Sequence, residues 1–218
     1  MVLSILQPEM DMTELLSQTR YELLHTPLIE WIAVLFGVAQ VLLAKNNNVL
    51  LYPAGIISTA LSIYILARVE LYAESVLNAY YLVMSIYGWL HWLYGRKNED
   101  LPITKASKHD WITTGVIVAV SWIILYLALQ RYTNSDVPAM DAWVSATAWA
   151  GMWLLAKRKL ENWILLNISN LFAIPLQLYK GIPLYGILTL VLFIVAIFGY
   201  FKWKNIYEEQ RPKLEPQH

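Results

Sequence analysis

The sequence predicts an all-α polytopic membrane protein, in which seven transmembrane helices form two parallel three-helix repeats joined by a fourth helix. Three observations lead to this fold class. The 218 residues are 58% hydrophobic and only 15% charged, unlike a soluble domain. Several apolar stretches exceed the roughly 18 residues that cross a bilayer. Two segments, 86–92 and 197–203, share one order of apolar, aromatic and glycine residues.

The chain begins with a polar segment and continues with seven apolar stretches. In the polar segment, Leu15, Leu16 and Leu23 stand among charged residues and indicate a short amphipathic helix at the membrane interface. The segment lacks the basic start and apolar core of a secretory signal. From Lys204 onward the chain is polar, and we expect a flexible tail. The expected helices cover approximately 28–44, 48–67, 70–94, 111–130, 138–156, 162–179 and 183–202.

The distribution of Lys and Arg tests the count of seven helices and orients the chain. With seven crossings, twelve basic residues lie on the side of the C-terminus and four on the side of the N-terminus. Short loops rich in Lys and Arg stay in the cytoplasm. We therefore expect the N-terminus outside and the C-terminus in the cytoplasm. The four outer residues are Arg20, Arg68, Arg131 and Lys180, and the loop 95–110 supplies Arg96, Lys97, Lys105 and Lys108 to the cytoplasmic side.

The first three helices are repeated in the last three. Segment 42–45 matches 154–157 with an offset of 112 positions, and Asn48 matches Asn162 after a two-residue insertion. Because one helix separates the copies, both have the same orientation, as in transporters whose site lies between the repeats near the midplane. The expected parts are an interfacial segment 1–27, repeat one 28–94, a basic loop with the linker helix 95–137, repeat two 138–203 and a cytoplasmic tail 204–218.

Polar side chains inside the helices at 70–94 and 162–179 form the candidate site. In lipid such groups are costly and usually face the protein interior or a cavity. Amides both donate and accept hydrogen bonds, and aromatic faces stack on flat rings and attract cations, so the set suits a heteroaromatic ligand. Alternatively, the amides only hold helices together. The candidate substrate-binding residues are Asn78, Tyr81, Trp89, Asn167, Asn170, Gln177 and Tyr200.

The two repeats differ in their polar residues. Asn78 corresponds to Thr189, while Asn167 and Asn170 correspond to Pro53 and Ile56 in this alignment. Helix contacts alone give no reason for this inequality, although sequence drift could produce it, whereas an asymmetric ligand would explain it.

Charged residues near the helix ends are weaker candidates. Asp141 and Glu30 lie near the outer helix ends, where they either attract a cationic ligand or simply favour the helix start. Glu74 is the one carboxylate placed to serve a coupling ion, although the interface is its simpler location. His91 and His109 are most simply surface residues of the cytoplasmic side.

Enzymatic motifs are absent from the sequence. It contains no zinc-protease motif, no glycine-rich phosphate loop and no Cys. We therefore expect no enzyme, no catalytic residue, no metal, no cofactor and no nucleic-acid partner. The expected partners are a small-molecule substrate and the lipid bilayer. A ligand-sensing receptor stays open as another class, and so does a homo-oligomer, because lipid-facing and subunit-facing surfaces look alike.

The sequence resembles the PnuC family of bacterial vitamin transporters. The resemblance rests on Ile-Tyr-Gly-Trp at 86–89 with Trp92, on Glu-Asn-Trp at 161–163 and on Asn170, and it extends over most of the chain. It implies a fold like that of the sugar-transporting SWEET proteins and a place in the bacterial inner membrane. It also implies uptake of nicotinamide riboside by facilitated diffusion, with trapping by a cytoplasmic riboside kinase.

The resemblance also implies roles for the candidate residues. Relatives carry thiamine or riboflavin, and one has Gln where this chain has Asn78, so these vitamins stay open as alternative substrates. We expect Asn78, Asn170 and Gln177 to bind carboxamide or ribose hydroxyls with support from Asn167 and Tyr81, while Trp89 and Tyr200 flank the ring or gate the path.

Overall fold

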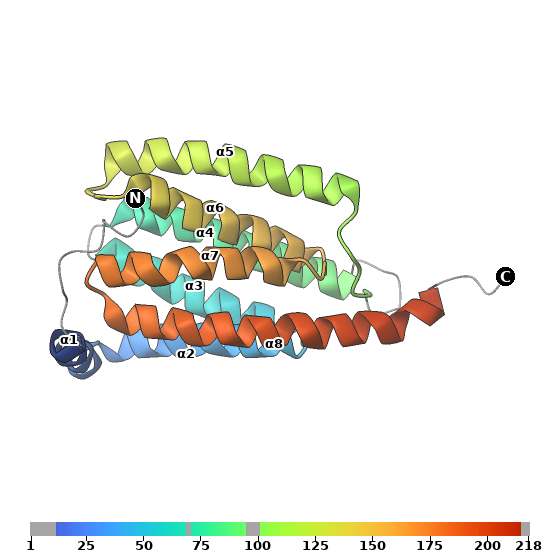
Figure 1. The fold of residues 1–218 in the computed structure, drawn as a ribbon, viewed down its shortest axis with the longest axis horizontal. Coiled ribbons are helices and arrows are strands. Elements are labelled where there is room, and N and C mark those ends of the chain that lie inside the picture. The colour runs from blue at the N-terminus through green and yellow to red at the C-terminus, as the bar shows by residue number, and fades with distance from the viewer. Residues whose placement is uncertain (1–11, 69–70, 95–100, 215–218) are drawn as a thin grey trace.

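The computed structural model describes residues 12–68, 71–94 and 101–214, and these form eight helices. Helices α2 to α8 lie side by side in one bundle, α1 lies across one end, and α8 extends beyond the other (Figure 1). The prediction of an all-helical chain is confirmed. The bounds are α1 Met12–His25, α2 Leu28–Lys45, α3 Leu51–Arg68, α4 Tyr72–Tyr94, α5 Lys108–Tyr132, α6 Pro138–Ala156, α7 Asn162–Tyr179 and α8 Pro183–Leu214.

Four of these helices are long and apolar enough to cross a membrane by length and composition, counted on the described residues. The remaining bundle helices α4, α6 and α7 fall short of that measure, but they run alongside the four (Figure 1). The prediction of seven crossings therefore stays a prediction. The four candidate spans are Leu28–Lys45, Leu51–Arg68, Lys108–Tyr132 and Pro183–Gln210.

Helix α5 begins three residues earlier than expected because its first turn is capped. The Ser107 hydroxyl accepts a hydrogen bond from the Asp110 backbone N–H at 3.1 Å. In return, the Asp110 carboxylate accepts one from the Ser107 backbone N–H at 2.8 Å. This reciprocal capping box satisfies two N–H groups that a helix start otherwise leaves without partners.

The prediction of a flexible tail from Lys204 is wrong for residues 204–214, which continue α8. Tertiary contacts stabilise this polar extension. The side chains of Ile206 and Tyr207 pack against the main hydrophobic core. The Gln210 side chain accepts a hydrogen bond at 3.1 Å from the backbone N–H of Ile103. A helix of such polar composition gains its stability from this packing rather than from its own amphipathicity.

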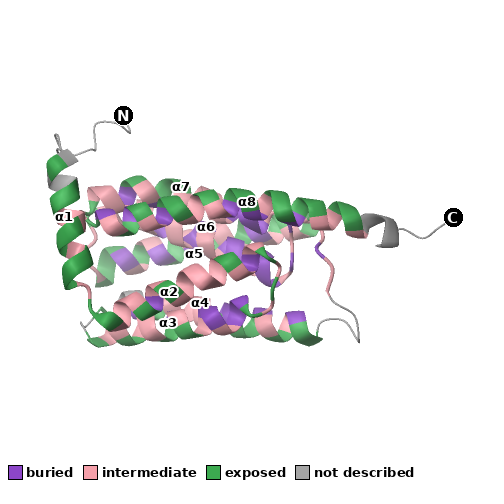
Figure 2. Ribbon diagram, turned by 90° about the horizontal axis from the view of Figure 1, so that it is seen from below, coloured by how far each residue is buried: buried purple, intermediate pink, exposed green. Residues whose placement is uncertain are grey.

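Helix α1 packs against the start of α8, as Figure 2 also indicates. The Gln18 side chain donates to the carbonyl of Gly181 in the turn between α7 and α8. The Glu22 carboxylate accepts from the backbone N–H of Leu184 at 3.1 Å and so caps the first turn of α8. These contacts place the amphipathic helix expected from the sequence across the end of the bundle.

Some predictions concern residues outside the described part of the chain. These are residues 1–11 of the interfacial segment, Arg96 and Lys97 of the basic loop, the side chain of Glu74, and residues 215–218 of the tail.

The packing of the bundle has the pattern of a two-fold axis. Within each set of three, the middle helix contacts its neighbours, α3 between α2 and α4, and α7 between α6 and α8. Between the sets, α4 contacts α6 and α8 contacts α2. Exchanging the sets turns one of these contacts into the other. Helix α5 packs mainly on α6, at the edge of the bundle (Figure 1).

Two tryptophan hydrogen bonds reproduce this symmetry at the level of single atoms. The Nε1–H of Trp203 in α8 donates to the carbonyl of Ala44 in α2 at 2.8 Å. The Nε1–H of Trp92 in α4 donates to the carbonyl of Leu155 in α6 at 3.3 Å. Donor and acceptor each shift by 111 positions between the two bonds. Both bonds join one set of three helices to the other.

A second pair of hydrogen bonds, within the sets, has the same offset. Ser58 of α3 donates to the carbonyl of Ala33 in α2 at 2.8 Å. Ser169 of α7 donates to the carbonyl of Val144 in α6 at 2.7 Å. Residues of α2, α3 and α4 are therefore equivalent to residues 111 positions later in α6, α7 and α8.

The alignment offset of 112 and the two-residue insertion are consequently wrong. The turn after α2 and the turn after α6 each contain one left-handed residue, Asn47 with φ 54° and Arg158 with φ 55°, again 111 positions apart. Apolar helices resemble one another in several registers, and the turns and the hydrogen bonds that recur in both sets distinguish these registers. With the corrected offset, Asn78 still pairs with Thr189, whereas Asn167 pairs with Ile56 and Asn170 with Thr59.

Candidate functional site

Four buried aromatic rings form a continuous chain across the boundary between the two sets of helices. The rings of Tyr52 and Trp92 meet edge to face, with 5.2 Å between centroids. Trp92 lies 6.0 Å from Trp203, and Trp203 lies 5.8 Å from Trp163 in a second edge-to-face contact. The order is palindromic, because Tyr52 is equivalent to Trp163 and Trp92 to Trp203. This aromatic chain fills the boundary near the end from which α8 extends, here called the basic end.

Arg158 is buried at the basic end, close to the approximate two-fold axis that relates the two sets of helices. Its guanidinium donates two hydrogen bonds to the Asn47 side-chain oxygen, at 3.1 and 2.9 Å from Nε and Nη2. It also lies 4.3 Å from the centroid of the Trp92 ring and donates to the carbonyl of Leu101. Only 7% of Arg158 is exposed. Since Asn47 and Arg158 are equivalent in the two sets, their contact spans the pseudo-axis.

A segment of extended chain, residues 101–107, crosses the basic end and is here called the strap. Thr104 accepts a backbone hydrogen bond from Leu160 at 2.9 Å, in an isolated bridge with the turn after α6. The backbone N–H of Ala106 donates to the carboxylate of Glu161 at 2.7 Å. The strap thereby joins the loop after α4 to the second set of helices.

The candidate residues from the sequence lie on three helices. The two helices that carry most of them, α4 and α7, do not pack against each other. Asn78, Tyr81 and Trp89 belong to α4, which packs against α3, α5 and α6. The three amides belong to α7, which packs against α6 and α8. Helices α4 and α7 thus each pack on α6 rather than on each other.

The aromatic candidates pack near the boundary between the two sets. Tyr81, Trp89 and Tyr200 are half-buried against the core that contains the aromatic chain. Their neighbour Tyr80 stacks on Trp149 of α6, with 4.2 Å between ring centroids, and its hydroxyl donates to the Trp149 carbonyl at 3.1 Å. The contact between α4 and α6 is therefore aromatic.

The amides of α7 present acceptor atoms that the described residues leave without partners. The side-chain oxygens of Asn167 and Gln177 are buried, and neither has a hydrogen-bond partner in that part of the chain. A buried acceptor without a partner costs about 1–3 kcal/mol unless a ligand or water supplies a donor. The two oxygens are ten positions apart, about 15 Å along a helix, so one small ligand would not contact both at once in this arrangement. Asn170 is half-buried between them.

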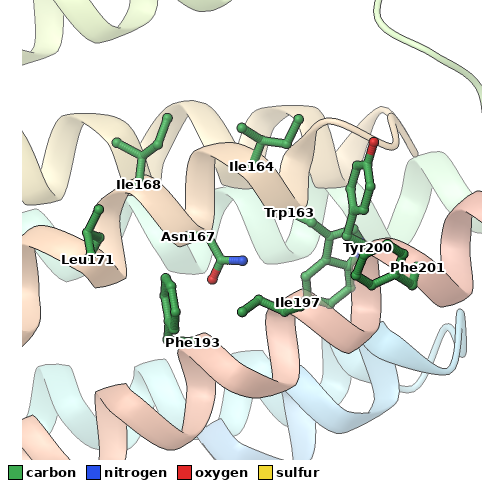
Figure 3. Close-up of a pocket in the computed structure, with 9 residues that line it drawn as sticks. All are labelled: Trp163, Ile164, Asn167, Ile168, Leu171, Phe193, Ile197, Tyr200 and Phe201. Carbon is green, nitrogen blue, oxygen red and sulfur yellow. The ribbon is translucent and has the colours of Figure 1, made fainter.

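Asn167 and Tyr200 line a pocket of about 360 Å³ between α7 and α8 (Figure 3). The other lining residues are apolar or aromatic. Several are exposed on the outside of the bundle, among them Leu171 and Phe201, each 56% exposed. The pocket therefore opens sideways, away from the pseudo-axis, and the Asn167 amide is its main polar group. Its remaining lining residues are Trp163, Ile164, Ile168, Phe193 and Ile197.

Asp141, expected from the sequence to lie near an outer helix end, has a structural partner. The Lys180 ammonium lies 2.6 Å from its Oδ1 and 2.7 Å from its Oδ2, and the Ser135 hydroxyl also donates to it. The pair ties the start of α6 to the end of α7, so Asp141 is engaged rather than free for a cationic ligand. Among the described residues, no group of three His, Cys, Asp or Glu side chains could hold a metal ion.

Comparisons with known proteins identify the family. Residues 27–205 match the family model described as nicotinamide mononucleotide transporter. The nicotinamide riboside transporter PnuC of Escherichia coli (strain K12) is 21% identical over 208 residues, covering 84% of this chain and 87% of that protein. The corresponding protein of Neisseria mucosa is 22% identical over 193 residues, with 80% and 71% covered.

The fold is also similar to a solved one. The crystal structure of the vitamin B3 transporter PnuC superposes with a TM-score of 0.67 at 19% identity, over 89% of this chain and 88% of that one. Because the family model covers most of the sequence, the resemblance seen in the residues is confirmed, and the chain belongs to the nicotinamide mononucleotide transporter family.

Proposed function

We propose that this protein is a membrane transporter that takes up nicotinamide riboside by facilitated diffusion, with the substrate trapped by phosphorylation in the cytoplasm. The membership in a family of transporters, with relatives named for this substrate, is the observation that carries the proposal. The charge distribution supports an outer N-terminus and a cytoplasmic C-terminus in the bacterial cell membrane.

We place seven crossings in the membrane, α2 to α8, as two three-helix repeats joined by α5 in a SWEET-like arrangement. The repeats are 28–94 and 138–203. The symmetric contacts of α4 with α6 and of α8 with α2 support this division. Parallel repeats of this kind place a substrate site between them near the midplane.

Alternating access would then be a rocking of one repeat against the other. The aromatic chain and the Arg158–Asn47 contact support a state that is closed at the basic end. Opening that end requires the two Trp hydrogen bonds between the repeats to break together, since symmetry makes them equivalent. A closed end held by a few polar contacts and packed rings can exchange with an open one at moderate cost.

The site we propose combines amides with aromatic faces. The seven residues are those expected from the sequence, with the amides of α7 reaching the substrate after α4 and α7 approach each other. An unpartnered oxygen, that of Asn167 or that of Gln177, supports this role, because a carboxamide or ribose hydroxyl supplies the donor that either one lacks. Aromatic faces such as Trp89 would stack on the pyridinium ring.

Binding and uptake test the proposal together. Purified protein is titrated calorimetrically with nicotinamide riboside, thiamine and riboflavin, and proteoliposomes are tested for uptake of each labelled compound. We expect binding and equilibrating uptake of the riboside alone. Binding of thiamine or riboflavin instead would move the substrate assignment. Binding without movement across the bilayer would indicate a receptor, and no binding of any of the three would refute the proposal.

Asn170→Leu tests the site itself. We expect the affinity for the riboside to fall by at least about tenfold, because a buried polar group of the ligand loses its partner. Thr59→Val at the equivalent position of the first repeat is the matched control, and we expect it to bind the riboside within about twofold of the wild type. Equal affinities of wild type and Asn170→Leu would remove Asn170 from the site.

A further inference from the structure

The basic end contains a polar pocket that the proposed transport site does not use. Its volume is about 390 Å³, within the usual range of small-molecule sites. Five separate pieces of chain form its walls: the end of α4, the strap, the start of α5, the end of α6 and the turn after α6. The lining residues are His91, Leu101, Pro102, Thr104, His109, Asp110, Trp153, Lys157 and Lys159.

The charges of this pocket do not cancel. Its carboxylate, Asp110, lies 3.1 Å from the Lys159 ammonium and also accepts two hydrogen bonds from Ser107. Asp110 is therefore already matched by one cation. The second ammonium, that of Lys157, has no ion-pair partner among the described residues, and it lies over the face of the Tyr87 ring, 5.7 Å from the centroid. Counted on the described residues that line it, the pocket thus has a net positive charge that an anion can satisfy.

Other polar groups that line the pocket with Lys157 can donate hydrogen bonds. His91, which stacks on Tyr87 with 5.8 Å between ring centroids, and His109 contribute imidazole N–H groups, and Thr104 contributes a hydroxyl. A phosphate monoester carries a charge near −1.5 to −2 and three strong acceptor oxygens, which such donors match. Trp153 adds an aromatic face on which a flat ring can stack.

We infer that this pocket binds the phosphate group of a phosphate ester, with Lys157 as its main charge partner. The strap, α4 and the turn after α6 all contribute to the pocket. A bound phosphate ester would therefore connect the first set of helices to the second and keep the basic end closed. This consequence for transport depends on the proposed function, whereas the binding itself does not.

The chain offers a matched control for Lys157. Lys45 lies at the same end as the last residue of α2, the helix equivalent to α6, and its ammonium lies 5.7 Å from the centroid of the Phe198 ring. Phe198 is the residue equivalent to Tyr87 under the offset of 111. Lys45 thus has the same cation–ring contact without lining the pocket. Lys45→Met removes one basic residue of the same end and leaves the pocket intact.

The test uses the full chain in nanodiscs of phosphatidylcholine, titrated calorimetrically with inorganic phosphate, adenosine monophosphate and adenosine. We expect phosphate and the monophosphate to bind and adenosine not to bind. Lys157→Met should weaken binding of the monophosphate by about tenfold or more, as when one partner of a buried charge pair is removed. Lys45→Met should stay within about twofold of the wild type. A thermal melt of each variant confirms that it is folded, and Lys157→Gln replaces Lys157→Met if that variant does not fold.

The phosphate group could also belong to a lipid headgroup, and a second experiment distinguishes this case from a soluble phosphate ester. The wild type and both variants are melted in nanodiscs with and without phosphatidylglycerol. A lipid headgroup would be the occupant of the pocket if two results occur together. Soluble phosphates do not bind, and phosphatidylglycerol raises the melting temperature of the wild type and of Lys45→Met but not of Lys157→Met. Absence of both effects, or equal effects of the two substitutions, would overturn the inference. Riboside binding is measured on the same samples, so a failure of the proposed function is recognised separately.

Discussion

Gly88→Ala should destabilise the protein because the added methyl group has no room. An ideal Cβ at Gly88 would lie 2.4 Å from Cε1 of Tyr52 and 2.7 Å from its hydroxyl oxygen. Ordinary contact begins at 3.4 Å, so the ring must move by roughly 1 Å, the difference between these distances. Tyr52 is only 1% exposed and touches Trp92 at the centre of the aromatic chain. It cannot move without displacing the boundary between the repeats.

The magnitude follows from two opposing effects. Overpacking of a core costs about 1–3 kcal/mol, and the higher helix propensity of Ala returns about 1 kcal/mol. We expect a net loss of up to about 2 kcal/mol in the free energy of unfolding. At the equivalent Gly199, the nearest atom is Cη2 of Trp163 at 2.8 Å, so Gly199→Ala should cost less. Gly115→Ala is the control, because nothing lies within 4 Å of its Cβ, and it should stabilise by about 0.5–1 kcal/mol.

The assay is denaturant-driven unfolding of the three variants in mixed micelles, with wild type alongside. The expected order of stability is Gly115→Ala, wild type, Gly199→Ala and Gly88→Ala. A double mutant with Tyr52→Leu separates the clash from other effects, since the cost of Gly88→Ala should largely disappear there. If Gly88→Ala is as stable as Gly115→Ala, the close approach of α4 to α3 is not as described, and the reasoning fails.

Three further substitutions test the two ends of the bundle. Trp203→Phe should cost about 2 kcal/mol in unfolding free energy, because it removes a hydrogen bond and leaves a small cavity; an unchanged melting curve would contradict this. Asp141→Asn should lower stability by about 1 kcal/mol or less in a salt-dependent manner, because it breaks the pair with Lys180, and riboside uptake should not change. Loss of uptake at unchanged stability would instead assign Asp141 to substrate attraction. Asn47→Gly removes the acceptor of Arg158 without straining the left-handed backbone, and it should increase labelling of cysteines introduced at the basic end; unaltered labelling would exclude a closing role for this contact.

The sequence by itself determined the helical class and most helix positions. Apolar stretches of this length leave few alternatives to helices, because every backbone polar group in lipid must be satisfied within its own segment. The predicted bounds of α6 and α7, 138–156 and 162–179, agree with the structure. The family resemblance was also visible in short motifs, since aromatic and glycine residues at fixed spacing are rare enough to be specific.

The register of the other helices of the repeats required the tertiary structure, because the sequence showed the offset of 111 only along 70–94 and 183–202. Sequence alignment of Leu-rich helices tolerates shifts of one to three residues, and it placed Asn170 opposite Ile56 rather than Thr59. The offset of 111 for all three helices follows from the bonds of Trp92 and Trp203, from those of Ser58 and Ser169, and from the two left-handed turn residues. These bonds join residues far apart in the chain, which no local pattern encodes.

Tertiary contacts also decided where α8 ends and how the basic end is packed. Residues 204–214 look like a polar tail, but their helix is stabilised by contacts with the strap, including that of Gln210 with Ile103. Arg158 is in sequence one of the twelve basic residues expected on the side of the C-terminus, yet it is buried against Trp92 and Asn47. A side chain's charge is read from the sequence, whereas its burial depends on which distant elements pack around it.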